Sequence, residues 1–105
     1  MKTLPTWAGR SEFKYDGSIK SGTTIYYGSG FSIQISASQY SALLQNFKGM
    51  TVNIGTSRDR APLGSVGDWL QKNVTPTATA SYIGAILIEE GYAKKGYLPA
   101  TIEFK

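Results

Sequence analysis

The hydrophobic period of the chain changes at Ser36, and this change constrains the fold more than any other sequence feature. Residues 31–36, FSIQIS, alternate apolar and polar side chains, which is the period of a strand with one buried face. In residues 40–47 the apolar side chains recur at the three- and four-residue spacing of one helical face. Ser36 and Gln39 fit a capping box at the start of this helix, and Gly49 suits its end. A strand followed directly by an amphipathic helix predicts an α+β fold.

The rest of the chain continues this mixture of strands and helices. Ser65, with Asp68 three residues later, predicts a helix start, and Thr75 followed by Pro76 predicts another. We therefore expect a strand at 31–36, a helix at 36–49, a short strand at 50–55, a short helix at 65–74, a longer helix at 75–91, a turn at 94–96 and a closing strand at 97–104. Residues 1–105 are expected to form a single domain in which three helices pack on a small antiparallel sheet. Residues 1–10 are expected to be a loose tail from which Trp7 packs back on the body, with one or two further short strands between this tail and residue 31.

The apolar faces of these elements define the expected core. Its members are Phe31, Ile33, Ile35, Leu43, Leu44, Phe47, Val52, Ile54, Trp69, Leu70, Ile83, Leu87, Ile102 and Phe104. The adjacent Tyr26 and Tyr27 lie on a short strand, so one of the two rings is expected to face solvent.

Composition narrows the functional classes. The chain has no cysteine, which removes disulfides, thiolate chemistry and Cys-type zinc sites. It also has no histidine, the commonest general base and metal ligand, so we expect no catalysis, no cofactor and no metal. No apolar run approaches the roughly 18 residues that span a bilayer, and the N-terminus has no secretory apolar segment. A cytoplasmic location with no membrane partner is therefore expected. The net charge of +4 suits a polyanionic partner such as nucleic acid, or an ordinary basic surface.

The stretch GTSRDRAPLGS, residues 55–65, combines two arginines with hydroxyl side chains and leads into the helix that starts at Ser65. Arg58 and Arg60 carry planar forks of donors that suit phosphate. Thr56, Ser57 and the N–H groups that follow Ser65 could complete an anion-binding loop at this helix start. The alternative is a structural loop that positions the helix, with Arg58 paired to Asp59, Asp68 or Glu103.

The C-terminal two-thirds of the chain resembles a winged-helix domain, a form of helix-turn-helix domain. The resemblance covers residues 36–105 and rests on the element order and on LIEEGYAKKG, residues 87–96. It implies a small non-catalytic DNA-binding protein whose last helix reads the major groove, while basic residues contact phosphates. The implied base-proximal residues are Thr77, Ser81 and Tyr82, and the implied phosphate contacts are Arg58, Arg60, Lys72, Lys94 and Lys95. The alternative is that this helix is buried, because YIGAILI is apolar around most of its circumference.

A second resemblance is to small uncharacterised bacterial proteins of the mobile-element type. It rests on the blocks GTSRDRAPLGSVGDWL and TPTATASYIGAILIEEGYA, and it implies no known activity. The rival hypothesis is therefore a protein–protein interaction or inhibitor module of a mobile element that binds no nucleic acid. Its expected contacts are Tyr26 or Tyr27, Tyr92, Tyr97 and Gly84.

Overall fold

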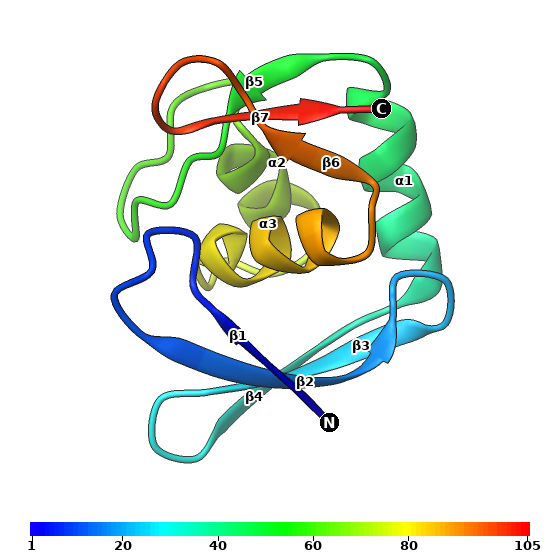
Figure 1. The fold of residues 1–105 in the computed structure, drawn as a ribbon, viewed down its shortest axis with the longest axis vertical. Helices are drawn as coiled ribbons and strands as arrows, with labels where there is room; N and C mark the ends of the chain where they lie inside the picture. The colour runs from blue at the N-terminus through cyan, green and yellow to red at the C-terminus, as the bar shows by residue number, and fades with distance from the viewer.

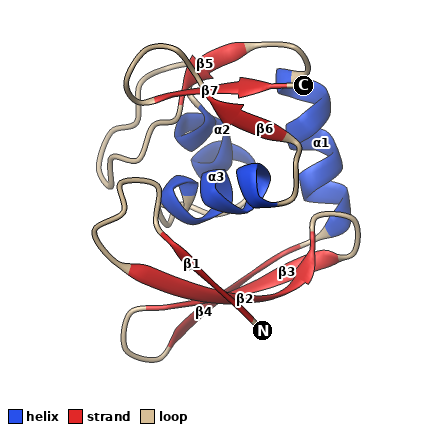
Figure 2. Cartoon of the chain, viewed as in Figure 1, coloured by secondary structure: helices blue, strands red, loops and turns tan.

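A computed structural model describes residues 1–105. In chain order the elements are β1 (Lys2–Pro5), β2 (Glu12–Ser18), β3 (Gly22–Tyr27), β4 (Phe31–Ile35), α1 (Ala37–Phe47), β5 (Thr51–Asn53), α2 (Val66–Asn73), α3 (Ala80–Glu89), β6 (Ala93–Lys95) and β7 (Thr101–Phe104). The expected α+β fold with three helices is confirmed, but the strands form two antiparallel sheets where one small sheet was predicted. Helix α3 lies between the two sheets, and Figures 1 and 2 show the helices grouped between them.

The first sheet is a four-stranded meander in the order β1-β2-β3-β4. The prediction that residues 1–10 form a loose tail is wrong, because Lys2 to Pro5 pair with Tyr15 to Glu12 as an edge strand. Pro5 stands at the last position of this edge strand, where its missing N–H does little harm. Lys2 also lies 3.9 Å from Glu89 of α3. The segment is ordered by pairing and by contacts with α3, neither of which leaves a periodic pattern in four residues.

Helix α1 follows the sheet directly and is capped as expected. The Ser36 side chain accepts a hydrogen bond from the Gln39 N–H at 3.1 Å, and the Gln39 side chain accepts one from the Ser36 N–H at 2.8 Å. The helix buries Tyr40, Leu43 and Phe47. Tyr40 and Thr23 of β3 share a buried hydrogen bond of 2.6 Å, which fixes α1 to the first sheet. Burial raises the pKa of Tyr40 to about 12.

The second sheet has the order β5-β7-β6, with β7 in the middle. Ile102 and Phe104 of β7 are buried, and the Phe104 ring stacks on Phe47 of α1 at 5.2 Å. The turn predicted at Lys94–Gly96 is wrong, because Lys94 and Lys95 belong to β6 and pair with Glu103 and Ile102. The connection to β7 instead runs through residues 96–100. Three residues are too few to show an alternating pattern, so β6 depends on its pairing with β7.

Helix α3 begins later than its sequence suggests. Its N-cap is Thr79, so the prediction of a cap at Thr75 and a first turn at Pro76 is wrong. The Thr75 hydroxyl instead accepts a hydrogen bond from the Thr77 N–H at 3.3 Å, which favours a local turn. Threonine is also a weak helix former, so the run TPTAT gains little by continuing the helix.

The C-terminal end of α3 is tied to the first sheet by one carboxylate. Glu90 accepts hydrogen bonds from the Tyr15 hydroxyl at 2.7 Å and from the Ile19 N–H at 2.9 Å. Burial, and then the bond to Glu90, raises the pKa of the Tyr15 hydroxyl. The β2–β3 hairpin is therefore held against one side of α3, and the second sheet covers the other side of this helix.

The core lies along α3 and extends into both sheets. Of the expected core residues, Ile35, Leu43, Phe47, Ile54, Leu70, Ile83, Leu87, Ile102 and Phe104 are buried, while Ile33, Leu44, Val52 and Trp69 are partly buried. The prediction for Phe31 is wrong, because its side chain is 59% exposed. Alternation along β4 places Phe31 on the same face as the buried Ile35, but at this end of the strand the side chain is left exposed. The core also contains residues of the first sheet and of its β2–β3 turn that were not predicted: Phe13, Tyr15, Ile19 and Ile25.

Candidate functional site

The loop at residues 55–65 is closed at its base by backbone packing. The Gly67 N–H donates to the Ile54 carbonyl at 2.9 Å, which joins the first turn of α2 to the end of β5. Gly55 has φ +68°, and a side chain on it would collide with Ser65. A loop with touching ends and a packed base is an Ω-loop. Its base sets where α2 begins, and Thr56 to Arg60 are carried outward and exposed.

At the start of α2, where an anion site was predicted, a carboxylate of the chain itself lies in place. Ser65 is 1% exposed, and its hydroxyl already accepts a hydrogen bond from the Asp68 N–H at 3.0 Å. Asp68 accepts a bond from the Gly64 N–H at 3.2 Å, so a carboxylate of the chain itself occupies this helix start. The Ser57 hydroxyl accepts a hydrogen bond from the Arg60 N–H at 3.3 Å, and its own O–H stays available as a donor. An external anion at this helix start would therefore meet the Asp68 carboxylate, and the Gly64, Gly67 and Asp68 N–H groups there already have partners.

The three predicted phosphate-binding lysines contact other parts of the fold. Lys72 lies 3.0 Å from Asp68, and its ammonium, more than the Gly64 N–H, holds the pKa of that carboxyl below its usual value. Lys94 lies 3.5 Å from Glu103. Lys95 lies 4.9 Å from the centre of the Trp7 ring and donates to the Trp7 carbonyl at 3.2 Å. These side chains are exposed, but each already has a partner.

Arg58 lies between two adjoining hollows, and neither it nor Arg10 forms an ion pair. The larger hollow, of about 670 Å³, is lined by Ser11, Glu12, Tyr27, Gly28, Phe31, Arg58, Pro76, Thr77, Ala78 and Tyr82. The smaller, of about 220 Å³, is lined by Thr6, Ala8, Arg10, Ser11, Thr56, Arg58, Ala78, Ser81 and Tyr82. The two hollows share four residues, and together we call them the arginine groove. None of the carboxylates considered as partners of Arg58 pairs with it.

The arginine groove brings together five of the predicted site residues: Thr56, Arg58, Thr77, Ser81 and Tyr82. Six others do not line it: Ser57, Arg60, Ser65, Lys72, Lys94 and Lys95. Sequence reasoning missed Arg10, which belongs to the segment predicted to be a loose tail. It also missed Phe31, which was assigned to the core. The one available signal for Phe31 was the glycine-rich turn beside it, since a turn marks the end of a strand.

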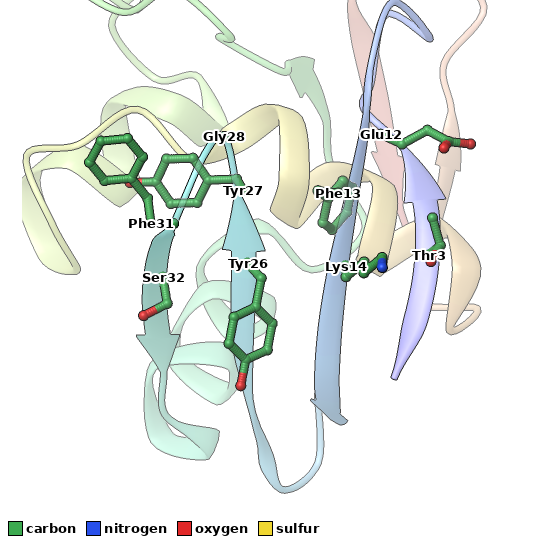
Figure 3. A pocket seen from close by; sticks show the side chains of 10 residues that line it. Thr3, Glu12, Phe13, Lys14, Tyr26, Tyr27, Gly28, Phe31 and Ser32 are labelled. Atoms are coloured by element: carbon green, nitrogen blue, oxygen red, sulfur yellow. The ribbon is translucent and has the colours of Figure 1, made fainter.

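A row of aromatic rings runs from the core into the groove, where Tyr27, Phe31 and Tyr82 line it. The Phe13 and Tyr82 rings lie 5.1 Å apart, as do those of Tyr82 and Tyr27, and Phe31 stacks on Tyr27 at 5.6 Å. Phe13 is buried and Phe31 is exposed, so the row leads from the core to the surface. Burial raises the pKa of Tyr82, while the nearby charge of Arg58 acts to lower it. Figure 3 shows Tyr27 and Phe31 side by side at one end of β3 and β4.

A third hollow, of about 490 Å³, opens on the other face of the first sheet and reaches the same aromatic end. The strand register places Thr3, Lys14, Tyr26 and Ser32 in one row across all four strands. Tyr26 is 38% exposed and Tyr27 is partly buried against the core, which confirms that one of the two rings faces solvent. This hollow shares Glu12, Tyr27, Gly28 and Phe31 with the arginine groove.

Helix α3 is buried along most of its length, as the alternative hypothesis expected. The Trp7 N–H donates to the Ser81 carbonyl at 3.0 Å, and a methyl group on Gly84 would lie 2.9 Å from the Trp7 ring. The helix therefore cannot lie lengthwise in a DNA major groove, and the predicted contacts reach the surface only around its N-terminal end. Burial also removes Gly84 from the expected protein contacts. Tyr92 is partly buried, while Tyr97 is 98% exposed.

Comparisons with protein-family models, with curated proteins and with solved structures find no match for this chain. No helix has both the length and the apolarity needed to cross a membrane. The structure contains no group of three or more acidic side chains placed to hold a metal ion.

Proposed function

We propose that this chain is a small non-catalytic nucleic-acid-binding protein that holds sugar-phosphate backbone in the arginine groove. The observation that carries the proposal is the position of Arg58, unpaired between two hollows and accompanied by Arg10. An arginine fork matches two phosphate oxygens, and it cannot lose its charge in water. Thr56, Thr77 and Ser81 add hydroxyl donors along the same groove. Proteins that bind nucleic-acid strands commonly do so with aromatic rings and arginines placed side by side.

The order of the elements supports a winged-helix-like body for this protein. From α1 onward the chain runs helix, strand, helix, helix, strand, strand, which is the order on which the resemblance rests. The β6–β7 hairpin then takes the place of the wing. The binding mode differs from that of a winged-helix domain, because Trp7 and the first sheet cover the helix that would read the bases. We therefore assign contact with nucleic acid to the groove around the N-terminal end of α3.

The test is a titration of labelled, mixed-sequence oligonucleotides at low and moderate salt. Replacing Arg58 with alanine should weaken binding several-fold and lower the slope of log affinity against log salt by about one unit, since one phosphate contact is lost. Arg60→Ala is the matched control, because it removes the same charge from the same loop but lies outside the groove. Equal losses from Arg58→Ala and Arg60→Ala would show that only net charge matters. No binding at low salt would refute the proposal.

A protein-binding role is the second candidate, favoured by the tip of the β6–β7 hairpin. Tyr97 is 98% exposed and the adjacent Leu98 is 63% exposed. Two large apolar side chains held outward on a short turn suit the centre of a protein interface. Tyr97→Ser should abolish such an interaction and leave oligonucleotide binding unchanged. Loss of oligonucleotide binding in this variant would instead place the hairpin tip in the nucleic-acid site.

A further inference from the structure

We infer that the groove takes a single strand of nucleic acid, with one unpaired base stacked on the ring of Phe31. This inference rests on the proposed function and adds the form of nucleic acid that is bound. Phe31 has one ring partner, Tyr27, at 5.6 Å and an interplanar angle of 21°. The side chain is nevertheless 59% exposed, so much of its apolar surface has no cover within the chain. An aromatic ring with an uncovered surface, stacked on a second ring, is a platform on which a base can continue the stack.

The β3–β4 turn holds this platform in place. Gly28 and Gly30 have φ values of +58° and +98°, which side-chain-bearing residues rarely adopt. A Cβ on Gly28 would lie 3.1 Å from the Phe31 ring, so the glycine leaves the space that the ring occupies. The Phe31 ring stacks on the Tyr27 ring, which in turn packs against Tyr82. Phe31 is thus positioned by the fold and is not merely an apolar residue left on the surface.

A duplex does not fit this arrangement. Bases in a double helix are stacked on their neighbours and present only their edges to a protein, whereas stacking on Phe31 needs an open base face. The helix that could enter a major groove is covered by Trp7. Recognition through the face of a base therefore selects an unpaired strand.

The hollows on either side of Phe31 give such a strand a continuous path. On one side, Lys14 and Tyr26 line the hollow on the outer face of the first sheet. On the other side, Arg58 and then Arg10 line the arginine groove. Lys14, Arg58 and Arg10 form no ion pair, so cations are free on both sides of the platform. Phosphates on either side of the stacked base would meet these cations, which is the pattern of charge and stacking that single strands require.

The experiment is fluorescence anisotropy with dye-labelled strands of about ten nucleotides, within the usual site size of such proteins. Oligo(dT) and oligo(U) distinguish DNA from RNA, and a mixed-sequence duplex of equal length is the third probe. We expect either single strand to bind at least about fivefold more tightly than the duplex, and Phe31→Leu to weaken single-strand binding by a similar factor. Phe31→Trp should keep the single-strand affinity of the parent protein, because a base also stacks on tryptophan. Tyr97→Leu is the matched control, since it removes an exposed aromatic ring outside the path.

The outcomes separate this inference from the proposed function. If Arg58→Ala weakens binding while Phe31→Leu does not, the groove binds phosphate but no base stacks on the platform, and the inference is overturned. Duplex binding as tight as single-strand binding overturns it in the same way and leaves the proposed function intact. If none of the three probes binds at low salt, both fail. Because Phe31 is exposed, Phe31→Leu should keep the melting temperature of the parent protein, so a change in affinity would not reflect unfolding.

Discussion

Gly67 is the residue on which the base of the 55–65 loop depends most closely, and alanine at this position tests that dependence. Gly67 lies in the first turn of α2, with its N–H bonded to the Ile54 carbonyl at 2.9 Å. A Cβ there would overlap the Gly55 carbonyl oxygen and lie 2.8 Å from the carbon of the same carbonyl. It would also lie 3.3 Å from the Cβ of Ala61. The two nearest atoms belong to the backbone at the loop base and the third is an alanine methyl, so no flexible side chain can move aside.

The size of the effect follows from these contacts. Forcing an extra carbon into a packed site costs roughly 1–3 kcal/mol. If α2 and β5 separate to make room, a buried backbone hydrogen bond is lost at a cost of about 1–3 kcal/mol. The better helix propensity of alanine offsets about 1 kcal/mol of this. We therefore expect Gly67→Ala to lower the free energy of unfolding by roughly 1–5 kcal/mol. The midpoint of about 3 kcal/mol lowers the melting temperature of a domain of this size by roughly 12–24 °C.

Thermal unfolding followed by circular dichroism measures this change. Gly64→Ala is the matched control within the same loop, because a Cβ at Gly64 meets no atom within 4 Å. Gly64 has φ +80°, so its replacement costs backbone strain alone, on the order of 1 kcal/mol. A melting temperature for Gly67→Ala at or above that of Gly64→Ala would refute the idea that the loop base is closed by glycine contact.

Four further predictions follow from other contacts. Trp7→Ala should lower the free energy of unfolding by about 2–4 kcal/mol in urea titrations, because it uncovers Gly84 and the middle of α3; an unchanged midpoint would show that the N-terminal segment is not needed to cover the helix. Thr79→Val should raise the melting temperature by a few degrees, since the Thr79 hydroxyl is buried with no partner; a lower value would point to a bond that this hydroxyl makes. Stability should fall between about pH 10 and 12, because the unfolded chain loses the Tyr40 proton near pH 10.0 while the folded chain keeps it; urea unfolding should show a smaller fall for Tyr40→Phe. Glu12→Gln should tighten oligonucleotide binding about two- to threefold at low salt, because it removes the one acidic side chain that lines the arginine groove; weaker binding would mean that Glu12 accepts a bond from the ligand.

Sequence was sufficient where an element is determined by local contacts. The change of period at Ser36 predicted both β4 and α1, because the capping box acts across three residues and the buried face of the helix spans two turns. It was insufficient where an element exists only by pairing with a distant segment. β1 and β6 have four and three residues, too few for a period to be visible, and each is a strand because a partner strand completes it. The late start of α3 has a local cause, the Thr75 turn, which the Thr-Pro pattern concealed.

The candidate site was also predicted only in part from the sequence. Arg58 was predicted from its side-chain chemistry and its place in the loop before a helix, whereas Thr77 and Tyr82 were implied by the winged-helix resemblance, and the fold places all three in the arginine groove. Arg10 enters this groove only because β1 pairs with β2, so residue types could not place it there. Alternation showed correctly which side of β4 carries Phe31. It could not show that this end of the buried face is left uncovered.

The N-terminal sheet accounts for both the largest error in the predicted fold and the change in the proposed binding mode. By pairing β1 with β2, the chain brings Trp7 onto α3 and removes the surface that would read a duplex. The same sheet carries Phe31 and Lys14 on its strands, and the β1–β2 loop carries Arg10. Under the function that we propose, a winged-helix-like body with this added sheet therefore loses one nucleic-acid surface and gains another. The gained surface offers ring faces and separate cations, which suits an unpaired strand better than a double helix.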